Sequence, residues 1–191
     1  MFKIATVTVA AIAVLSSAAC SPPNERESTR PPTTTSVAPA VVFNDADVMF
    51  LQMMYPHHAQ AVDMAKLVPT RSQNQQVKDL ATAIENAQAP EMAQMTTLLA
   101  SFGKPAPSAT MGHSMPGLMT SQQMTSLEGL SGAAFDKMWL QMMVEHHQGA
   151  IDMAQDELRD GDNPDVKKMA QSIITAQRGE IATMKGMLAA M

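Results

Sequence analysis

Apolar side chains recur at helical spacing along most of the chain after residue 44. When residues 45–68 are placed at steps of 100°, one face collects Phe50, Met53, Met54, His57, Ala61, Met64 and Ala65. Similar spacing continues in later segments, and no segment shows the alternation of a half-buried strand. The pattern predicts helices over 45–68, 74–100, 132–159 and 164–190, with a short additional helix over 120–128.

Capping residues mark the starts of two of these helices. Asn163 followed by Pro164 is typical of an N-cap and a first helical position. Thr120 and Gln123 have the spacing of a capping box.

The helical part of the sequence contains an internal repeat. A shift of 89 residues aligns 47–99 with 136–188 without a gap, and 23 of the 53 aligned positions are identical. Such self-similarity indicates an internal duplication in which each copy is one supersecondary unit. Each copy has the pattern of a helical hairpin, so we predict an all-α chain, a four-helix bundle built from two duplicated hairpins. The crossover between the copies, 101–131, is longer than a tight turn.

Two prolines interrupt the helices of the first copy. Pro56 lies inside 45–68 and should release the carbonyl of Gln52, and Pro90 lies inside 74–100, where the second copy has Gly179. We interpret both prolines as bends that let the helices wrap around each other.

The first 43 residues have the composition of a targeting segment and a tether. Residues 1–19 combine one Lys, a short apolar stretch and small residues, as in a secretory signal, and about a dozen apolar residues are too few for a permanent membrane span. The signal ends at Cys20, which resembles the lipidated cysteine of a bacterial lipoprotein; ordinary cleavage that leaves a free thiol is the alternative. Residues 20–43 are rich in Pro, Ser and Thr and predict a disordered tether. We therefore expect an exported protein, lipid-anchored to the outer face of the cell membrane or periplasmic, with membrane contact through the anchor only.

Composition narrows the functional classes. The 191 residues include 19 Met but only one Trp, one Tyr, five Phe and one Cys, with a formal net charge of −5. A hydrophobic fraction of 46% supports a folded core, and one Cys excludes a disulfide framework. The acidic balance argues against nucleic acid as a main partner. The chain contains no Walker, GxGxxG, GxSxG or CxxC motif.

The most distinctive chemistry is a pair of consecutive histidines in each copy, each preceded by a methionine one helical turn earlier. The two sets are His57-His58 with Met53-Met54, and His146-His147 with Met142-Met143. Thioether sulfur suits Cu(I), and imidazole accepts both oxidation states of copper as well as zinc. Because the whole set is duplicated, it favours binding of a soft metal, and Cu(I) above all.

Further sulfur donors lie close to these pairs. Met64 and Met153 share the faces of His57 and His146, about two turns further on, and could supply an additional ligand. The alternative for all these methionines is a core role, because methionine on the inner face of a bundle usually fills gaps. A buried histidine is likewise usually a hydrogen-bonded core residue.

The crossover holds another methionine cluster. Met111, His113, Met115 and Met119 lie in a stretch that also contains Gly and Pro, where helical core packing does not account for them. Flexible segments of this kind can wrap a soft ion, which would make the cluster a capture loop. The alternative is a loop whose methionines fold under the bundle.

A di-iron enzyme is the third possibility. Such a site needs Glu from two helices and Glu-x-x-His from the other two, and here only Glu91 and Glu180 could serve as the lone carboxylates. We instead expect these two residues, with Gln88 and Gln177, to make polar contacts that orient the histidines. Since no nucleophile is placed by a motif beside a His–carboxylate pair, we expect no catalytic residue and no enzymatic activity.

The strings around the histidine pairs resemble the DUF305 family. They run from Met53 to Ala65, with His57-His58 and Asp63-Met64, and from Met142 to Ala154, with His146-His147 and Asp152-Met153. The resemblance covers residues 44–191. It implies a ferritin-like helical bundle and an exported, Met- and His-rich protein, in a group that includes periplasmic copper-binding proteins of the CopM type. The chain departs from the family in having Pro56 and Pro90 in its first hairpin.

Three functional hypotheses follow. The first is a lipid-anchored copper-binding protein that sequesters Cu(I) or transfers it to or from a copper-donor or acceptor protein. The second is an interaction module whose methionine-rich surface binds a peptide or membrane partner without metal. The third is the di-iron enzyme. The distance between the two histidine pairs is the observation that best separates them.

Overall fold

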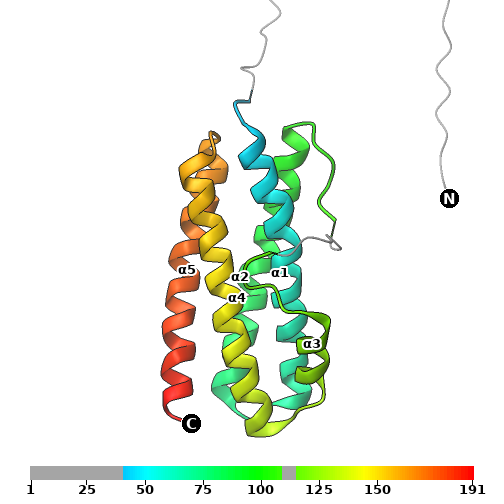
Figure 1. The fold of residues 1–191 in the computed structure, drawn as a ribbon, viewed down its shortest axis with the longest axis vertical. Helices are drawn as coiled ribbons and strands as arrows, with labels where there is room; N and C mark the ends of the chain where they lie inside the picture. Colours follow the sequence, from blue (N-terminus) through cyan, green and yellow to red (C-terminus); the bar gives the residue numbers. More distant parts are fainter. Residues whose placement is uncertain (1–40, 109–114) are drawn as a thin grey trace, which may run out of the picture. The chain divides into compact units, whose positions relative to one another are not determined.

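Five helices make up the fold of the computed structural model, which describes residues 41–108 and 115–191. They are α1 (Asp45–Arg71), α2 (Gln75–Ser101), α3 (Ser121–Glu128), α4 (Gly132–Asp160) and α5 (Pro164–Ala189) (Figure 1). The described ranges contain no strand. None of the helices in this part of the chain combines the length and the apolar character that crossing a membrane requires. The signal segment 1–19, Cys20, the tether up to residue 40, Met111 and His113 lie outside the described residues.

The predicted helices are confirmed, with ends within a few residues of those expected. Thr120 and Gln123 form the predicted capping box of α3, and Asn163 caps α5 ahead of Pro164. An additional capping box at Asn44 starts α1. Both α1 and α2 continue through their internal prolines rather than ending there.

The four long helices pack as two hairpins joined through one central contact. The helix α1 lies against α2, α4 lies against α5, and α1 also packs along α4, whereas α2 and α5 barely touch (Figure 1). The core that these contacts bury includes ten methionines besides its aliphatic and aromatic side chains. The indole Nε1 of Trp139 donates a hydrogen bond across the α1–α4 contact to the carbonyl of Met64, at 3.0 Å. Methionine thus fills much of the volume that aromatic rings would occupy in another bundle.

A buried carboxylate ties the start of α1 to the α4–α5 turn. Asp47 is inaccessible to solvent and accepts hydrogen bonds from the backbone N–H groups of Asn44, Asp162 and Asn163 at 2.7, 3.2 and 2.9 Å. Burial on its own would raise the pKa of Asp47, but these donors outweigh it and the net pKa is lowered. The neighbouring Glu157 is also buried, and burial together with the proximity of Asp47 raises its pKa to about 8. Glu157 therefore holds a proton at neutral pH, and its neutral side chain can lie beside the Asp47 carboxylate.

The crossover segment 115–119 is fixed to both central helices. The side-chain amide of Gln60 donates to the carbonyl of Met119 at 2.8 Å and accepts from its N–H at 2.7 Å. On the other side, a Cβ atom at Gly149 would overlap the carbonyl group of Pro116. The positive φ of Gly117, 72°, lets the chain turn at this close approach. The segment therefore lies directly on α4 because a glycine leaves room for it.

Replacing Gly149 by alanine is expected to destabilise the protein, although alanine favours helix. The new methyl group would meet backbone atoms, which cannot rotate away, so we expect Gly149→Ala to lower the free energy of unfolding by about 1–3 kcal/mol. Gly179→Ala in α5 is the matched control because nothing lies within 4 Å of its new Cβ, and it should stabilise by about 0.5–1 kcal/mol. Urea unfolding followed by circular dichroism measures both, and equal changes would contradict the close contact.

Candidate metal centre

The two histidine pairs meet in the middle of the bundle. His57 and His58 come from α1, His146 and His147 come from α4, and none of the four side chains is accessible to solvent. The rings of His57 and His146 lie against each other with centroids 3.8 Å apart and planes tilted by 40°. Within α4, the ring centroids of His146 and His147 are 6.2 Å apart. The structure therefore brings both pairs to one place rather than leaving two separate half-sites.

The outer histidine of each pair is held by a glutamate from the neighbouring helix. His58 Nε2 bonds Glu91 Oε2 of α2 at 2.7 Å, and His147 Nε2 bonds Glu180 Oε2 of α5 at the same distance. A carboxylate accepts, so each Nε2 carries the proton, and in the neutral ring this leaves the Nδ1 lone pair free. Metal-binding histidines typically donate their second N–H to a carboxylate in this way, which fixes tautomer and ring orientation.

The inner histidines differ from each other. His57 Nε2 donates to the backbone carbonyl of Pro116 at 3.0 Å, so the crossover segment caps this ring. Neither nitrogen of His146 has a hydrogen-bond partner among the described residues. The capping carbonyl is thus present on only one side of an otherwise duplicated centre.

Burial keeps both inner imidazoles neutral. Desolvation lowers the pKa of His57 to about 3, and repulsion from His58 and His147 adds to the effect. The pKa of His146 is lowered well below 6.5, again first by burial and then by its histidine neighbours. A neutral imidazole is the form that binds a metal ion.

Several buried polar atoms around this centre make no hydrogen bond within the described ranges. They are Nδ1 of all four histidines, Nε2 of His146, both amide atoms of Gln88 and Oε1 of Gln177. Gln88 and Gln177 lie almost one turn before Glu91 and Glu180 and occupy matching positions in the two copies. Buried polar groups in proteins are nearly always paired, and unpaired ones call for a ligand such as water or an ion. The unpaired imidazole nitrogens of the four histidines are donors of a kind that binds a metal ion.

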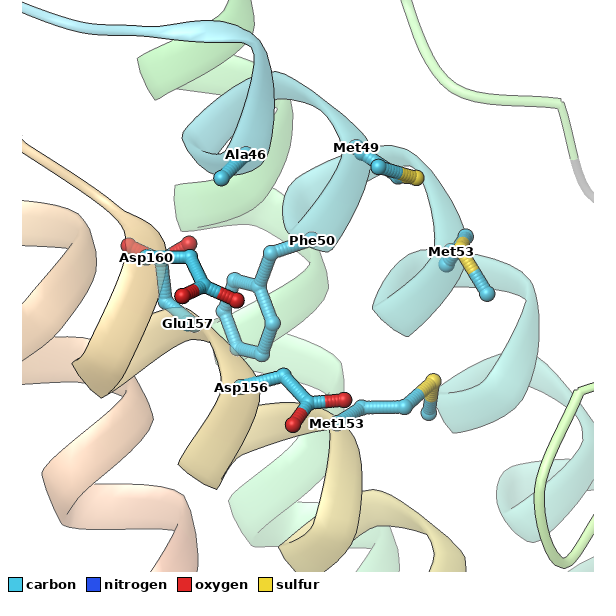
Figure 2. Close-up of a pocket in the computed structure, with 8 residues that line it drawn as sticks. All are labelled: Ala46, Met49, Phe50, Met53, Met153, Asp156, Glu157 and Asp160. Carbon is cyan, nitrogen blue, oxygen red and sulfur yellow. The ribbon is translucent and has the colours of Figure 1, made fainter.

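The predicted sulfur donors are distributed over several environments. Met54, Met64 and Met143 are fully buried, and Met142 and Met153 are nearly so. Met53 is partly exposed and lines a surface pocket together with Met153 (Figure 2). In the crossover, Met115 and Met119 are buried in the hydrophobic core. Met115 and Met119 therefore lie folded under the bundle, as in the alternative to a capture loop.

Carboxylates do not converge with the histidines as a di-iron site requires. In the described part of the chain, no group of three or more His, Cys, Asp or Glu side chains is arranged to hold a metal ion. Glu91 and Glu180 each bind one histidine at opposite sides of the centre. A metal ion bound here would need thioether sulfur to complete its coordination, and this favours a soft ion.

Sequence reasoning missed the part that the crossover backbone plays. The carbonyl of Pro116 carries no side-chain signal, and Gln60 and Gly149 were not singled out as functional. A signal was nevertheless available, because the 89-residue shift aligns Gln60 with Gly149, two very different residues, between the identical His-His and Asp-Met-Ala strings. Unlike residues at matching positions of a duplication mark places where the two copies have different neighbours.

Comparisons with known proteins relate the chain to one family. The family model DUF305, described as a domain of unknown function, matches residues 47–188. A DUF305 protein from Streptomyces coelicolor that is predicted to be secreted is 33% identical, with a TM-score of 0.71 over 76% of this chain and 93% of its own. A DUF305 fragment from Deinococcus radiodurans is 34% identical, with a TM-score of 0.71 over 78% of this chain and 98% of its own.

A copper-bound protein is also similar. CopM in its Cu(II)-bound form is 30% identical, with a TM-score of 0.67 over 75% of this chain and 96% of its own. Structures of CopM with Cu(I), with silver and without metal match as well. No curated protein sequence matches the chain.

Metal-free protein is expected to lose stability as the pH falls below about 6.5. The unfolded chain then binds protons at His57 and His146, whose folded pKa values are depressed. Their contribution to stability is therefore complete above pH 6.5 and is lost as the pH falls, down to about pH 3 for His57. Each residue contributes a slope of up to about 1.4 kcal/mol per pH unit. Urea unfolding at several pH values should show a smaller slope for His57→Gln/His146→Gln. Equal slopes would mean that both rings are protonated in the folded protein.

Proposed function

The chain belongs to the DUF305 family, and we propose that it is a copper-binding protein that works outside the cytoplasm. Its role would be to sequester Cu(I) or to hand it to another protein, and so to provide copper tolerance. The likeness to CopM structures with bound copper supports a copper-related role at a coarse level. The likeness to a predicted secreted protein supports the location.

One observation carries the proposal. Four buried histidines meet at the α1–α4 contact with every Nδ1 unpaired among the described residues, and two of the rings are oriented by glutamates. Leaving so many buried polar atoms unpaired costs free energy. A bound ion would recover that cost, and the carboxylate partners already select the tautomer that presents Nδ1.

Cu(I) is the ion that best matches the available donors. His57, His58, His146 and His147 would supply nitrogen, and the buried sulfurs of Met54 and Met143, each one turn from a histidine, are the nearest soft donors by sequence. Of the other predicted sulfur donors, Met53 and Met153 line a surface pocket, and Met64 and Met142 are buried. The proposed ligand set of the histidine centre does not need these four. Because thioether ligands are weak and replaceable, transfer to a partner protein would need no catalytic step, and we propose no enzymatic activity.

Several finer points belong to the same proposal. We infer that the bundle is ferritin-like and arose by duplication of a helical hairpin, and that Cys20 carries a lipid anchor. The tether would then hold the copper-binding bundle away from the membrane. Met111, His113, Met115 and Met119 remain a capture loop only as an expectation, since two of them lie outside the described residues and the other two are buried.

A second candidate function is an interaction module that binds no metal. It is favoured by one arrangement: the histidines are buried and partly hydrogen-bonded, while Met49, Met53 and Met153 line an open pocket. A protein of this kind would bind its partner equally well with and without copper.

Cu(I) competition separates the two functions. The full chain with Cys20→Ser is titrated anaerobically against a chromophoric Cu(I) chelator, so that no thiol contributes. We expect Glu91→Gln/Glu180→Gln to weaken binding by about 10–100-fold, because the histidines lose the partners that orient them. The alanine variant of all four histidines should lose the buried site.

The matched control is Asp63→Asn/Asp152→Asn. These aspartates are also duplicated and negatively charged, but they are exposed on the outer side of α1 and α4. They should leave the Cu(I) affinity unchanged, and circular dichroism checks that every variant is folded. If the glutamate variant binds as tightly as the control, and the histidine variant retains the full stoichiometry, copper does not bind at this centre.

A further inference from the structure

An open groove lies between the first half of α1 and the last half of α4, away from the histidines. It has a volume of about 250 Å³ and is lined by Ala46, Met49, Phe50, Met53, Met153, Asp156, Glu157 and Asp160. Figure 2 shows the three methionine side chains on one side of the Phe50 ring and the acidic side chains along α4. We refer to Met49, Met53 and Met153 as the open triad.

The exposure of the open triad is unusual for methionine. Met49 is 56% exposed, and no other large apolar side chain in the described helices is classed as exposed. Met53 is partly exposed, and Met153 is nearly buried at the base of the groove. Solvent can therefore reach thioether sulfur here, whereas the four histidines have no exposed surface.

The acidic wall leaves the groove with a net negative charge. Asp156 and Asp160 both pair with the exposed guanidinium of Arg159, at 2.9 and 2.7 Å. One cation cannot neutralise two carboxylates, so one negative charge remains next to the sulfurs. A negatively charged groove attracts a cation.

The duplication supplies an internal comparison, because all three methionines recur. The 89-residue shift takes Met49, Met53 and Met153 to Met138, Met142 and Met64, which we call the closed triad. These residues belong to the last half of α1 and the first half of α4, the halves that do not line the groove. Met64 and Met142 are buried there, and Met138 is partly buried.

The walls of the closed triad differ from those of the groove in both size and charge. Ala46 and Phe50 are replaced by the larger Phe135 and Trp139, and both of these are fully buried. The three acidic positions become Leu67, Val68 and Arg71. The clearest difference is at the first position of each triad: Met49 is 56% exposed, whereas Met138 is partly buried. The open end has Ala46 and three acidic side chains in its wall, and the aligned positions at the closed end are Phe135, Leu67, Val68 and Arg71.

We propose that the open triad is a surface site for one soft monovalent cation, Cu(I) or Ag(I), held by the sulfurs of Met49, Met53 and Met153. Core packing alone does not account for it, because the closed triad shows how the same three positions are packed when packing is all that is required. The inference rests on the proposed copper-binding function for its cargo, but it uses ligands that are separate from the histidine centre. The site would take the ion from solvent before it reaches the buried centre.

Silver titration followed by NMR tests the site residue by residue. The full chain with Cys20→Ser, labelled with 13C in its methionine methyl groups and in its imidazoles, receives silver nitrate in chloride-free buffer. Ag(I) serves as a redox-inert soft cation. We expect the methyl signals of the open triad to shift while those of the closed triad stay in place. Met49→Leu should lower the silver stoichiometry by one ion.

The matched control is Met138→Leu, which removes the sulfur aligned with Met49 in the closed triad and should leave the stoichiometry unchanged. Equal losses in the two variants, or no shift at the open triad, overturn the surface site. Shifts at the histidines without shifts at the open triad would leave the buried copper site standing and refute only this inference. Shifts at the open triad alone would support it and count against the histidine centre. No silver binding at all would refute both and leave the groove to the metal-free function.

Discussion

The dry contact between His57 and His146 constrains the rest of the structure. Two imidazoles packed against each other between α1 and α4, with a histidine beside each, place many polar nitrogen atoms where water does not reach. Such a cluster is costly unless its members find partners. Glu91 from α2 and Glu180 from α5 reach in from outside, and each hairpin thereby contributes one carboxylate to a histidine of its own copy. The polar centre thus ties all four long helices together, although α2 and α5 barely touch.

The crossover segment breaks the symmetry of this centre. In the first copy, Gln60 clamps the backbone of Met119, and in the second copy the matching Gly149 leaves space for Pro116. The result is a carbonyl placed over His57 with no equivalent on His146. Two chemically identical half-sites have therefore become unlike, one ring with a capped Nε2 and one with both nitrogens unpaired among the described residues. A ligand that enters the centre meets less competition at His146 than at His57.

The helices and the pairing of the two copies could be predicted from sequence because both depend on regular repetition. Apolar spacing and caps such as Asn163 and Thr120 are local signals. The 89-residue shift that aligns the two histidine pairs also aligns Glu91 with Glu180. The predicted polar contacts of these two glutamates are confirmed by their bonds to His58 and His147. The cap over His57 and the exposure of Met49 could not be predicted, because both depend on how distant parts of the chain are arranged in space. The cap over His57 comes from a backbone atom of a loop, and the exposure of Met49 depends on what covers it. The aligned Met49 and Met138 differ in exposure according to the residues that pack over them.

The two triads indicate how a duplicated bundle can divide its tasks. Burying a methionine side chain contributes roughly 1.5–3 kcal/mol, and the protein forgoes much of this contribution at Met49, which is 56% exposed. The opposite end compensates with the buried rings of Phe135 and Trp139, and the Trp139 indole also donates to the carbonyl of Met64 across the α1–α4 contact. The aligned positions around the two triads carry different side chains, so the two ends of the α1–α4 contact are packed differently. The buried rings and the Trp139 hydrogen bond stabilise the protein at the closed end. The open end can therefore carry small and charged residues that pack less tightly. Positions at which the copies agree therefore report on the shared fold and the histidine centre, and positions at which they disagree report on tasks that only one end performs.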